Sequence, residues 1–199
     1  MISVYKIKPK FQKLLQPILF LLRKIGVSPN QITIFTVFFS IAIGVFLFFG
    51  IENKLLFLFV SLALLLRMAL NALDGMMAKQ FNLQSTKGEI LNEIGDIISD
   101  VAIYFPFIYF NTIKIEYVII FLVLSVINEF CGVLSKSIYG LRRYDGPMGK
   151  SDRALMVGLI CIALYFSHAV LNYLNYVFVF GIFLMIISSY KRLTKINKK

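Results

Sequence analysis

The chain has 199 residues, of which 59% are hydrophobic, and its mean hydropathy is +0.81. Soluble domains are about 45–50% apolar, and a soluble fold of this length cannot hide so much apolar surface. The formal net charge of +11 does not indicate nucleic acid, because the basic residues gather at the ends of apolar runs. There they set topology and meet anionic lipid headgroups. The composition therefore predicts an all-α integral membrane protein that binds membrane lipids and no nucleic acid.

The N-terminal segment has the pattern of a helix that lies in the membrane interface. Residues 9–25 place apolar side chains at helical spacing beside lysine and arginine. Gly26 interrupts this pattern, and Pro29 suits the first turn of a following helix. We predict an N-terminal cytoplasmic or interfacial amphipathic helix within residues 1–28 and a transmembrane domain over residues 29–199.

Six apolar runs follow, each near the roughly 20 residues that a helix needs to cross the hydrocarbon core. They cover 31–50, 55–78, 89–110, 115–138, 153–170 and 172–190. Lysine and arginine are abundant before the first run, after the last run, and in the second and fourth connections, and they are scarce in the others. The positive-inside rule then places both termini and these two connections in the cytoplasm, as in a multi-pass protein of the bacterial inner membrane.

Oxygen-bearing side chains gather where the second run ends and the third begins. Asn71 and Asp74 are three residues apart and share a helix face, while Asn92, Asp96 and Asp100 step by four along the next helix. A short connection makes the two helices antiparallel neighbours, so these stripes can meet just inside the cytoplasmic surface. Such ligands suit a hard cation, Mg²⁺ above all, or else Mn²⁺ or Ca²⁺. The alternative is that these residues only join helices through hydrogen bonds.

Two further ionisable residues lie inside apolar runs, Arg67 in the second and Glu129 in the fourth. Ionisable side chains are costly in lipid and are usually paired or functional. Arg67 therefore either pairs with Glu129 or extends its guanidinium toward the interface.

The polar segment resembles the signature of the CDP-alcohol phosphotransferases, D-x-x-D-G-x-x-A-R followed after a spacer by G-x-x-x-D-x-x-x-D. The matching positions are Asp74, Gly75, Ala78, Gly88 and Asp96. Residues 29–33 also resemble the P-N-x-x-T element at the start of this family's first span. The chain departs from the signature at three positions, with amides in place of two aspartates and lysine in place of arginine: Asn71, Asn92 and Lys79.

The resemblance implies a metal-dependent CDP-alcohol phosphatidyltransferase, and the six-helix transmembrane domain is then the catalytic one. Such an enzyme moves a phosphatidyl or similar substituted phosphate group from a CDP-linked lipid donor, such as CDP-diacylglycerol, to an alcohol acceptor and releases CMP. The resemblance also implies Mg²⁺ or Mn²⁺ as cofactor, a homodimer and an active site that faces the cytoplasm.

Site residues follow from the matched positions. By resemblance Asp96 is the catalytic base. The expected metal ligands are Asn71, Asp74, Asn92, Asp96 and, one turn deeper, Asp100. The residues expected to bind CDP and its phosphates are Asn30, Thr33, Gly75, Ala78, Lys79 and Gly88.

A basic connection rich in Gly and Pro leads into the fifth run. Helix N-termini and arginine bind phosphate, and family members that use phosphorylated acceptors have a similar Gly-Lys element here. We predict that Lys150 and Arg153, with Arg142 and Arg143, bind a polyol-phosphate acceptor such as glycerol 3-phosphate or inositol phosphate. The alternative is that these residues only set topology and contact lipid.

Two other functions remain open from the sequence. Asn71 and Asn92 lower the charge of the expected metal site, so the chain could bind nucleotide or lipid, or serve as a partner protein, without transferring a group. Intramembrane acids also serve small transporters, although the chain shows neither an internal repeat nor a pair of broken helices.

Overall fold

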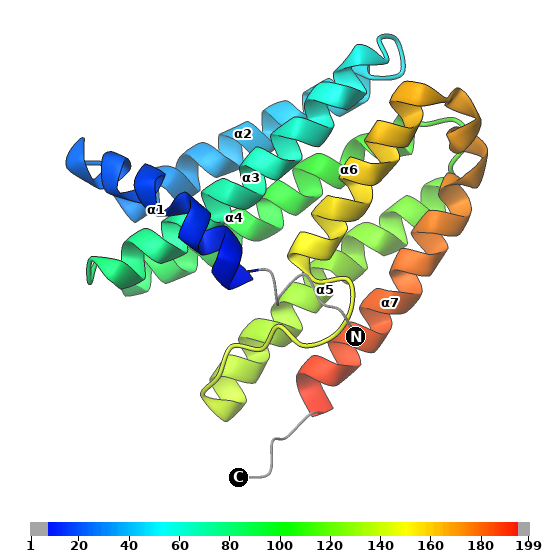
Figure 1. Cartoon of the computed structure of the whole chain (residues 1–199). Coiled ribbons are helices and arrows are strands. Elements are labelled where there is room, and N and C mark those ends of the chain that lie inside the picture. The colour runs from blue at the N-terminus through cyan, green and yellow to red at the C-terminus, as the bar shows by residue number, and fades with distance from the viewer. Residues whose placement is uncertain (1–7, 195–199) are drawn as a thin grey trace.

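The computed structural model describes residues 8–194, and this range forms helices without any strand. The α-helices are α1 (Lys8–Lys24), α2 (Pro29–Phe49), α3 (Leu55–Gln80), α4 (Thr86–Tyr104), α5 (Ile115–Tyr139), α6 (Lys150–Phe166) and α7 (Leu174–Thr194). Two short 3₁₀ helices, η2 (Phe105–Tyr109) and η3 (His168–Tyr173), join them. Figure 1 shows α2 to α7 running beside one another, with α1 lying across one end. The first seven residues of the predicted N-terminal segment and the last five of the predicted cytoplasmic C-terminus lie outside the described residues.

The helix α1 covers nearly the stretch that the amphipathic pattern indicates. Leu15 and Leu19 are buried in a small apolar cluster with Leu73 and Met77 of α3. Leu14 stays largely exposed, at 73%. One face of α1 therefore packs on the end of α3. The opposite face is the one that would contact the membrane interface, as the sequence predicts.

The start of α2 is set by local sequence. Ser28 is the N-cap, its hydroxyl accepts the backbone N–H of Gln31, and the Gln31 side chain accepts the backbone N–H of Ser28 at 2.8 Å. This capping box satisfies N–H groups that a helix start leaves without partners, and Pro29 needs none. The cap places Asn30 and Thr33 on the first turn of α2.

Within residues 8–194, four helical segments are long and apolar enough to cross a membrane by length and composition, namely α2, α3, α5 and His168–Thr194. The helix α4 spans 19 residues but carries several acidic side chains, and α6 has only 17 residues. The third predicted run ends early, because Pro106 removes a backbone donor and the chain continues as η2. The fifth ends at Phe166. The fold is thus an all-helical integral membrane protein.

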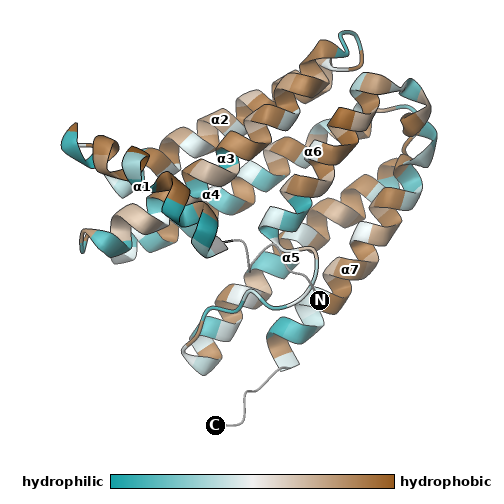
Figure 2. Ribbon diagram, in the orientation of Figure 1, coloured by the Kyte–Doolittle hydropathy of each residue, from teal (hydrophilic) through white to brown (hydrophobic). Residues whose placement is uncertain are grey.

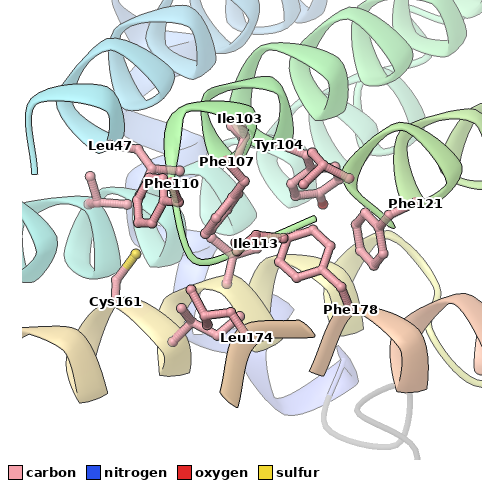
Figure 3. Packing of buried hydrophobic residues seen from close by; sticks show 14 of the residues in the cluster. Leu47, Ile103, Tyr104, Phe107, Phe110, Ile113, Phe121, Cys161, Leu174 and Phe178 are labelled. Carbon is pink, nitrogen blue, oxygen red and sulfur yellow. The ribbon is translucent and has the colours of Figure 1, made fainter. Parts of the chain in front are cut away.

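An aromatic core joins η2 to α5 and α7. The Phe107 ring packs at a steep angle against Phe178, with centroids 5.1 Å apart, and Phe121 contacts both Phe178 and Tyr104. Figure 3 shows these rings meeting between the helices. In contrast, many large apolar side chains remain exposed on the outside of the helices, which are mostly brown in Figure 2. Such a surface suits contact with lipid.

The helices α2 and α4 approach closely where glycine replaces a larger side chain. A Cβ at Gly44 would overlap the carbonyl oxygen of Ala102, and one at Gly95 would lie 3.4 Å from the Thr33 methyl group. Small residues allow such contact between helix backbones. This approach brings the first turn of α2 beside the polar stripe of α4.

Candidate active site

A cavity of about 1120 Å³ opens at the end of the bundle where α3 ends and α4 begins. The first turns of α2, α4 and α6 and the last turns of α3 and α7 contribute to its wall. Of the residues expected at the site, it is lined by Asn30, Thr33, Asn71, Asp74, Gly75, Ala78, Lys79, Gly88, Asn92, Asp96, Arg142 and Lys150. Asp100, Arg143 and Arg153 are not among its lining residues.

The two buried carboxylates of the motif have partners on other helices. The Thr33 hydroxyl of α2 donates to Asp74 Oδ2 of α3 at 3.0 Å. The Lys150 ammonium, at the start of α6, donates to Asp96 Oδ2 of α4 at 2.5 Å. Four helices therefore fix the orientation of these two acids.

The two amides of the motif face the same cavity. In the part of the chain that the structure describes, neither Asn71 nor Asn92 forms a side-chain hydrogen bond, so their oxygens are open to a ligand. A Cβ at Gly75 would meet no atom within 4 Å, whereas one at Gly88 would lie 2.8 Å from Asn30 Oδ1. Gly75 thus leaves open space in the cavity, and Gly88 allows Asn30 to approach α4.

The residues present fit a hard divalent cation, with a ligand set that carries few negative charges. The set offers carboxylate oxygens from Asp74 and Asp96 and amide oxygens from Asn71 and Asn92, which suits Mg²⁺ or Mn²⁺ and not zinc. Within residues 8–194 no group of three or more Asp, Glu, His or Cys side chains is placed to hold a metal. Two of the four positions are amides, so a cation would rely on two charges.

Asp100 lies away from the other expected ligands. It sits one turn beyond Asp96 on α4, about 5.4 Å along the helix axis, and is 2% exposed. Its Oδ1 accepts Arg67 Nη2 at 2.9 Å and its Oδ2 accepts Arg153 Nη2 at 2.5 Å. Both Asp100 oxygens thus bind arginine, and the structure corrects the expected pairing of Arg67, which contacts Asp100 and not Glu129.

The four basic residues expected on the acceptor side separate into two groups. Lys150 and Arg142 line the cavity, whereas Arg153 is fully buried below it and Arg143 pairs with Asp145 in the connection. The guanidinium of Arg153 turns into the bundle toward Asp100 and Glu129, which takes it out of the wall.

The guanidinium of Arg142 is held by two acids from different helices. Its Nη2 lies 2.7 Å from Glu93 Oε2 of α4 and 3.0 Å from Glu129 Oε2 of α5. Burial alone would lower the pKa of Arg142, but these two carboxylates outweigh burial and raise the pKa. A Cβ at Gly132 would collide with the Arg142 guanidinium, so this glycine allows the connection to lie on α5.

Among the lining residues that the sequence does not assign to the site are three ionisable ones that pair with one another or with Arg142: Glu93, Glu129 and Arg192. Arg192, in the last turn of α7, is 1% exposed, and its Nη1 lies 3.6 Å from Glu129 Oε1. Glu129 stood out as an acid inside an apolar run. Arg192 could not be distinguished from the other basic residues near the C-terminus, whose pattern only indicates topology.

The chain is thus a helical membrane protein with an oxygen-lined cavity at one end of its bundle, bordered by basic side chains. The profile of the CDP-alcohol phosphatidyltransferase family matches residues 26–188. The inner membrane protein YnbA of Escherichia coli (strain K12) is 46% identical over 165 residues, which is 82% of each chain. An uncharacterized protein of Aquifex aeolicus (strain VF5) is 29% identical over 177 residues, covering 80% of this chain and 84% of that one. The chain therefore belongs to the CDP-alcohol phosphatidyltransferase family.

Solved structures share the fold. Mycobacterium tuberculosis phosphatidylinositol phosphate synthase PgsA1 with CDP-DAG bound matches with a TM-score of 0.73 and 19% identity, covering 91% of this chain and 92% of that one. The complex of PgsA1 with manganese and citrate matches with a TM-score of 0.70 and 21% identity over 89% of this chain and 86% of that one. At this identity the likeness concerns the fold.

Proposed function

We propose that the protein transfers a phosphatidyl or similar substituted phosphate group from a CDP-linked lipid donor to an alcohol acceptor, with release of CMP. The observation that supports this most is the cavity itself. It brings the motif side chains of α3 and α4 together with basic side chains of α6, α7 and the connection before α6. A diphosphate and a second anionic substrate can both be bound there.

The donor end is formed by α2, α3 and α4. Asn30 and Gly88 lie together at the helix starts, where the positive end of each helix dipole favours phosphate. Gly75 leaves room for the nucleotide, and Lys79 offers a point charge to phosphate. PgsA1 has been solved with CDP-DAG, and CDP-diacylglycerol is accordingly the first donor to test.

Asn71, Asp74, Asn92 and Asp96 would hold the divalent cation, and Asp100 is dropped from this set because both its oxygens bind arginine. Bound Mg²⁺ or Mn²⁺ supplies positive charge that offsets the charge developing on the departing CMP. PgsA1, which has been solved with manganese, supports ions of this kind.

Asp96 is proposed as the base that takes the proton from the acceptor hydroxyl. Its carboxylate lies at the cavity wall, and the Lys150 ammonium holds one oxygen and leaves the other open. A base in this position must reach the attacking hydroxyl directly.

The acceptor is proposed to carry a phosphate, as glycerol 3-phosphate or inositol phosphate does. Three basic residues line the cavity: Lys150, Arg142 and Arg192. Their positive charges suit the binding of a phosphomonoester. Arg192 replaces Arg153 and Arg143 in the acceptor set that the sequence predicts.

The remaining proposals concern the membrane. We propose six spans, α2 to α7, with α4 and α6 crossing despite their polar residues because these face the cavity and the bundle interior. Residues 1–28 would form the interfacial segment and 29–199 the catalytic domain, with both termini and the cavity in the cytoplasm. The location is the inner membrane, as the name of YnbA states for that protein, and the protein would form a homodimer.

The test is an assay of CMP release by the purified protein with CDP-diacylglycerol, Mg²⁺ or Mn²⁺ and a panel of alcohols. We expect CMP with a phosphorylated polyol and none without metal. Folded protein that binds the donor but releases no CMP with any acceptor would contradict the transferase and favour a binding function, which Asn71 and Asn92 motivate.

A further inference from the structure

A chain of buried polar contacts joins all the helices from α2 to α7, and three of its members, Arg67, Glu129 and Arg192, also line the cavity. Successive members approach within 2.5–3.6 Å. In order they are Ser40, Arg67, Asp100, Arg153, Glu129 and Arg192. Each is at most 4% exposed. Buried networks of this kind act as a unit, because removing one member leaves its neighbours without partners.

Arg153 is shared between two acids. Its Nη2 donates to Asp100 Oδ2 at 2.5 Å and to Glu129 Oε1 at 2.9 Å, while its Nε also faces Asp100 at 3.2 Å. Glu129 in turn faces Arg142 at 3.0 Å and Arg192 at 3.6 Å, and both of these line the cavity. The charge on Asp100 therefore decides how strongly the Glu129 carboxylate can pair with Arg142 and Arg192 in the cavity wall.

We propose that Asp100 is a positioning residue for the phosphate-binding wall of the cavity, acting through Arg153 and Glu129; this inference rests on the proposed function. When Asp100 is ionised, its carboxylate on α4 balances the positive charge of Arg153. Glu129 is then available to orient Arg142 and Arg192. Without that charge, Arg153 stays buried and turns to Glu129 as its remaining carboxylate partner, since an unpaired buried cation is costly. Arg192 then loses its carboxylate partner, and Arg142 keeps only the carboxylate of Glu93.

The test compares Asp100→Asn with the unchanged protein, both full-length in nanodiscs, by direct binding of glycerol 3-phosphate, CDP and Mn²⁺. We expect glycerol 3-phosphate to bind at least about 10-fold more weakly, with the affinities for CDP and Mn²⁺ unchanged. Asp145→Asn, which removes a carboxylate that pairs only with Arg143, is the matched control and should change none of the three. A loss of Mn²⁺ affinity in Asp100→Asn would make Asp100 a metal ligand and overturn the proposal.

A second variant separates positioning from packing. Adding Arg153→Gln to Asp100→Asn removes the buried cation, so Glu129 returns to the wall and most of the affinity for glycerol 3-phosphate should return. A double variant that binds as weakly as Asp100→Asn alone would overturn the proposal. If Asp100→Asn does not fold, Arg153→Lys replaces it: an ammonium cannot span both acids, and the same selective loss is expected.

The outcomes also separate this inference from the proposed function. Wild-type protein that binds neither glycerol 3-phosphate nor inositol phosphate would overturn the role of Asp100, because no phosphate-binding wall would then exist. A different result would contradict the transferase activity alone: the wild-type protein binds glycerol 3-phosphate, Asp100→Asn loses this binding, and the wild-type protein releases no CMP.

Discussion

At the scale of single residues, one helical turn separates two kinds of acid on α4. Asp96 faces the cavity and the Lys150 ammonium, whereas Asp100 faces the buried guanidinium groups of Arg67 and Arg153. The same turn on α6 separates Lys150 from Arg153. Position along α4 and α6, and not residue type, therefore separates Asp96 and Lys150 in the cavity wall from Asp100 and Arg153.

Asp96→Asn is expected to lower CMP release about 100-fold or more, because an amide cannot accept the proton of the acceptor hydroxyl. The rate would be measured at saturating donor and acceptor. An unchanged unfolding temperature shows that the fold persists, and full activity in the variant would remove Asp96 as the base.

The double variant Asn71→Asp with Asn92→Asp is expected to bind Mn²⁺ at least about 10-fold more tightly, because it adds two negative charges beside Asp74 and Asp96. Titration of Mn²⁺ by electron paramagnetic resonance measures this directly. The isosteric change keeps the side-chain shapes, so equal affinity in the two proteins would show that these positions do not contact the ion.

At the scale of helices, the close crossing of α2 and α4 holds the site together. Gly44 lies against the carbonyl of Ala102 toward the C-terminal ends of both helices, and Gly95 lies against Thr33 close to the cavity. Because the obstacle at Gly44 is backbone, no rotamer change can relieve a larger side chain there.

Gly44→Ala should therefore destabilise the protein by about 1–3 kcal/mol, as overpacking at a tight contact does. Gly158→Ala on α6 is the control, since its Cβ would lie 3.9 Å from Leu64 Cδ1 in ordinary contact. Unfolding in mixed detergent micelles measures both variants. Equal stability of the two would show that α2 and α4 do not approach so closely.

At the scale of the whole molecule, the polar chemistry lies at one end of the bundle and the aromatic core nearer the other. The cavity is lined by residues from all the helices α2 to α7, while Phe107, Phe121 and Phe178 belong to the apolar core and do not line it. Apolar side chains cover the outside of the helices (Figure 2). A lipid-linked donor can thus keep its tails in the bilayer while its headgroup enters the cavity.

Six spans place successive connections on alternate sides of the membrane. Single cysteines at Glu52 and Lys114, both exposed, should react with a membrane-impermeant maleimide on intact spheroplasts. A cysteine at Lys87 should react only after the membrane is opened. The native Cys131 and Cys161 are buried and should give little background. Reaction of Lys87→Cys from outside would reverse the orientation, and mixed results for the other two would change the number of spans.

Sequence patterns alone were enough to predict a helical membrane protein, the approximate helix limits and the residues that line the cavity where α3 ends and α4 begins. These depend on hydrophobic periodicity, capping and the spacing of residues within or between adjacent helices, which are local properties. Only the tertiary structure decided the partners of Arg67, Asp100, Glu129 and Arg153 and brought Arg192 to the wall. Those pairings depend on how helices distant in the chain cross and at what depth, and no local pattern encodes that geometry.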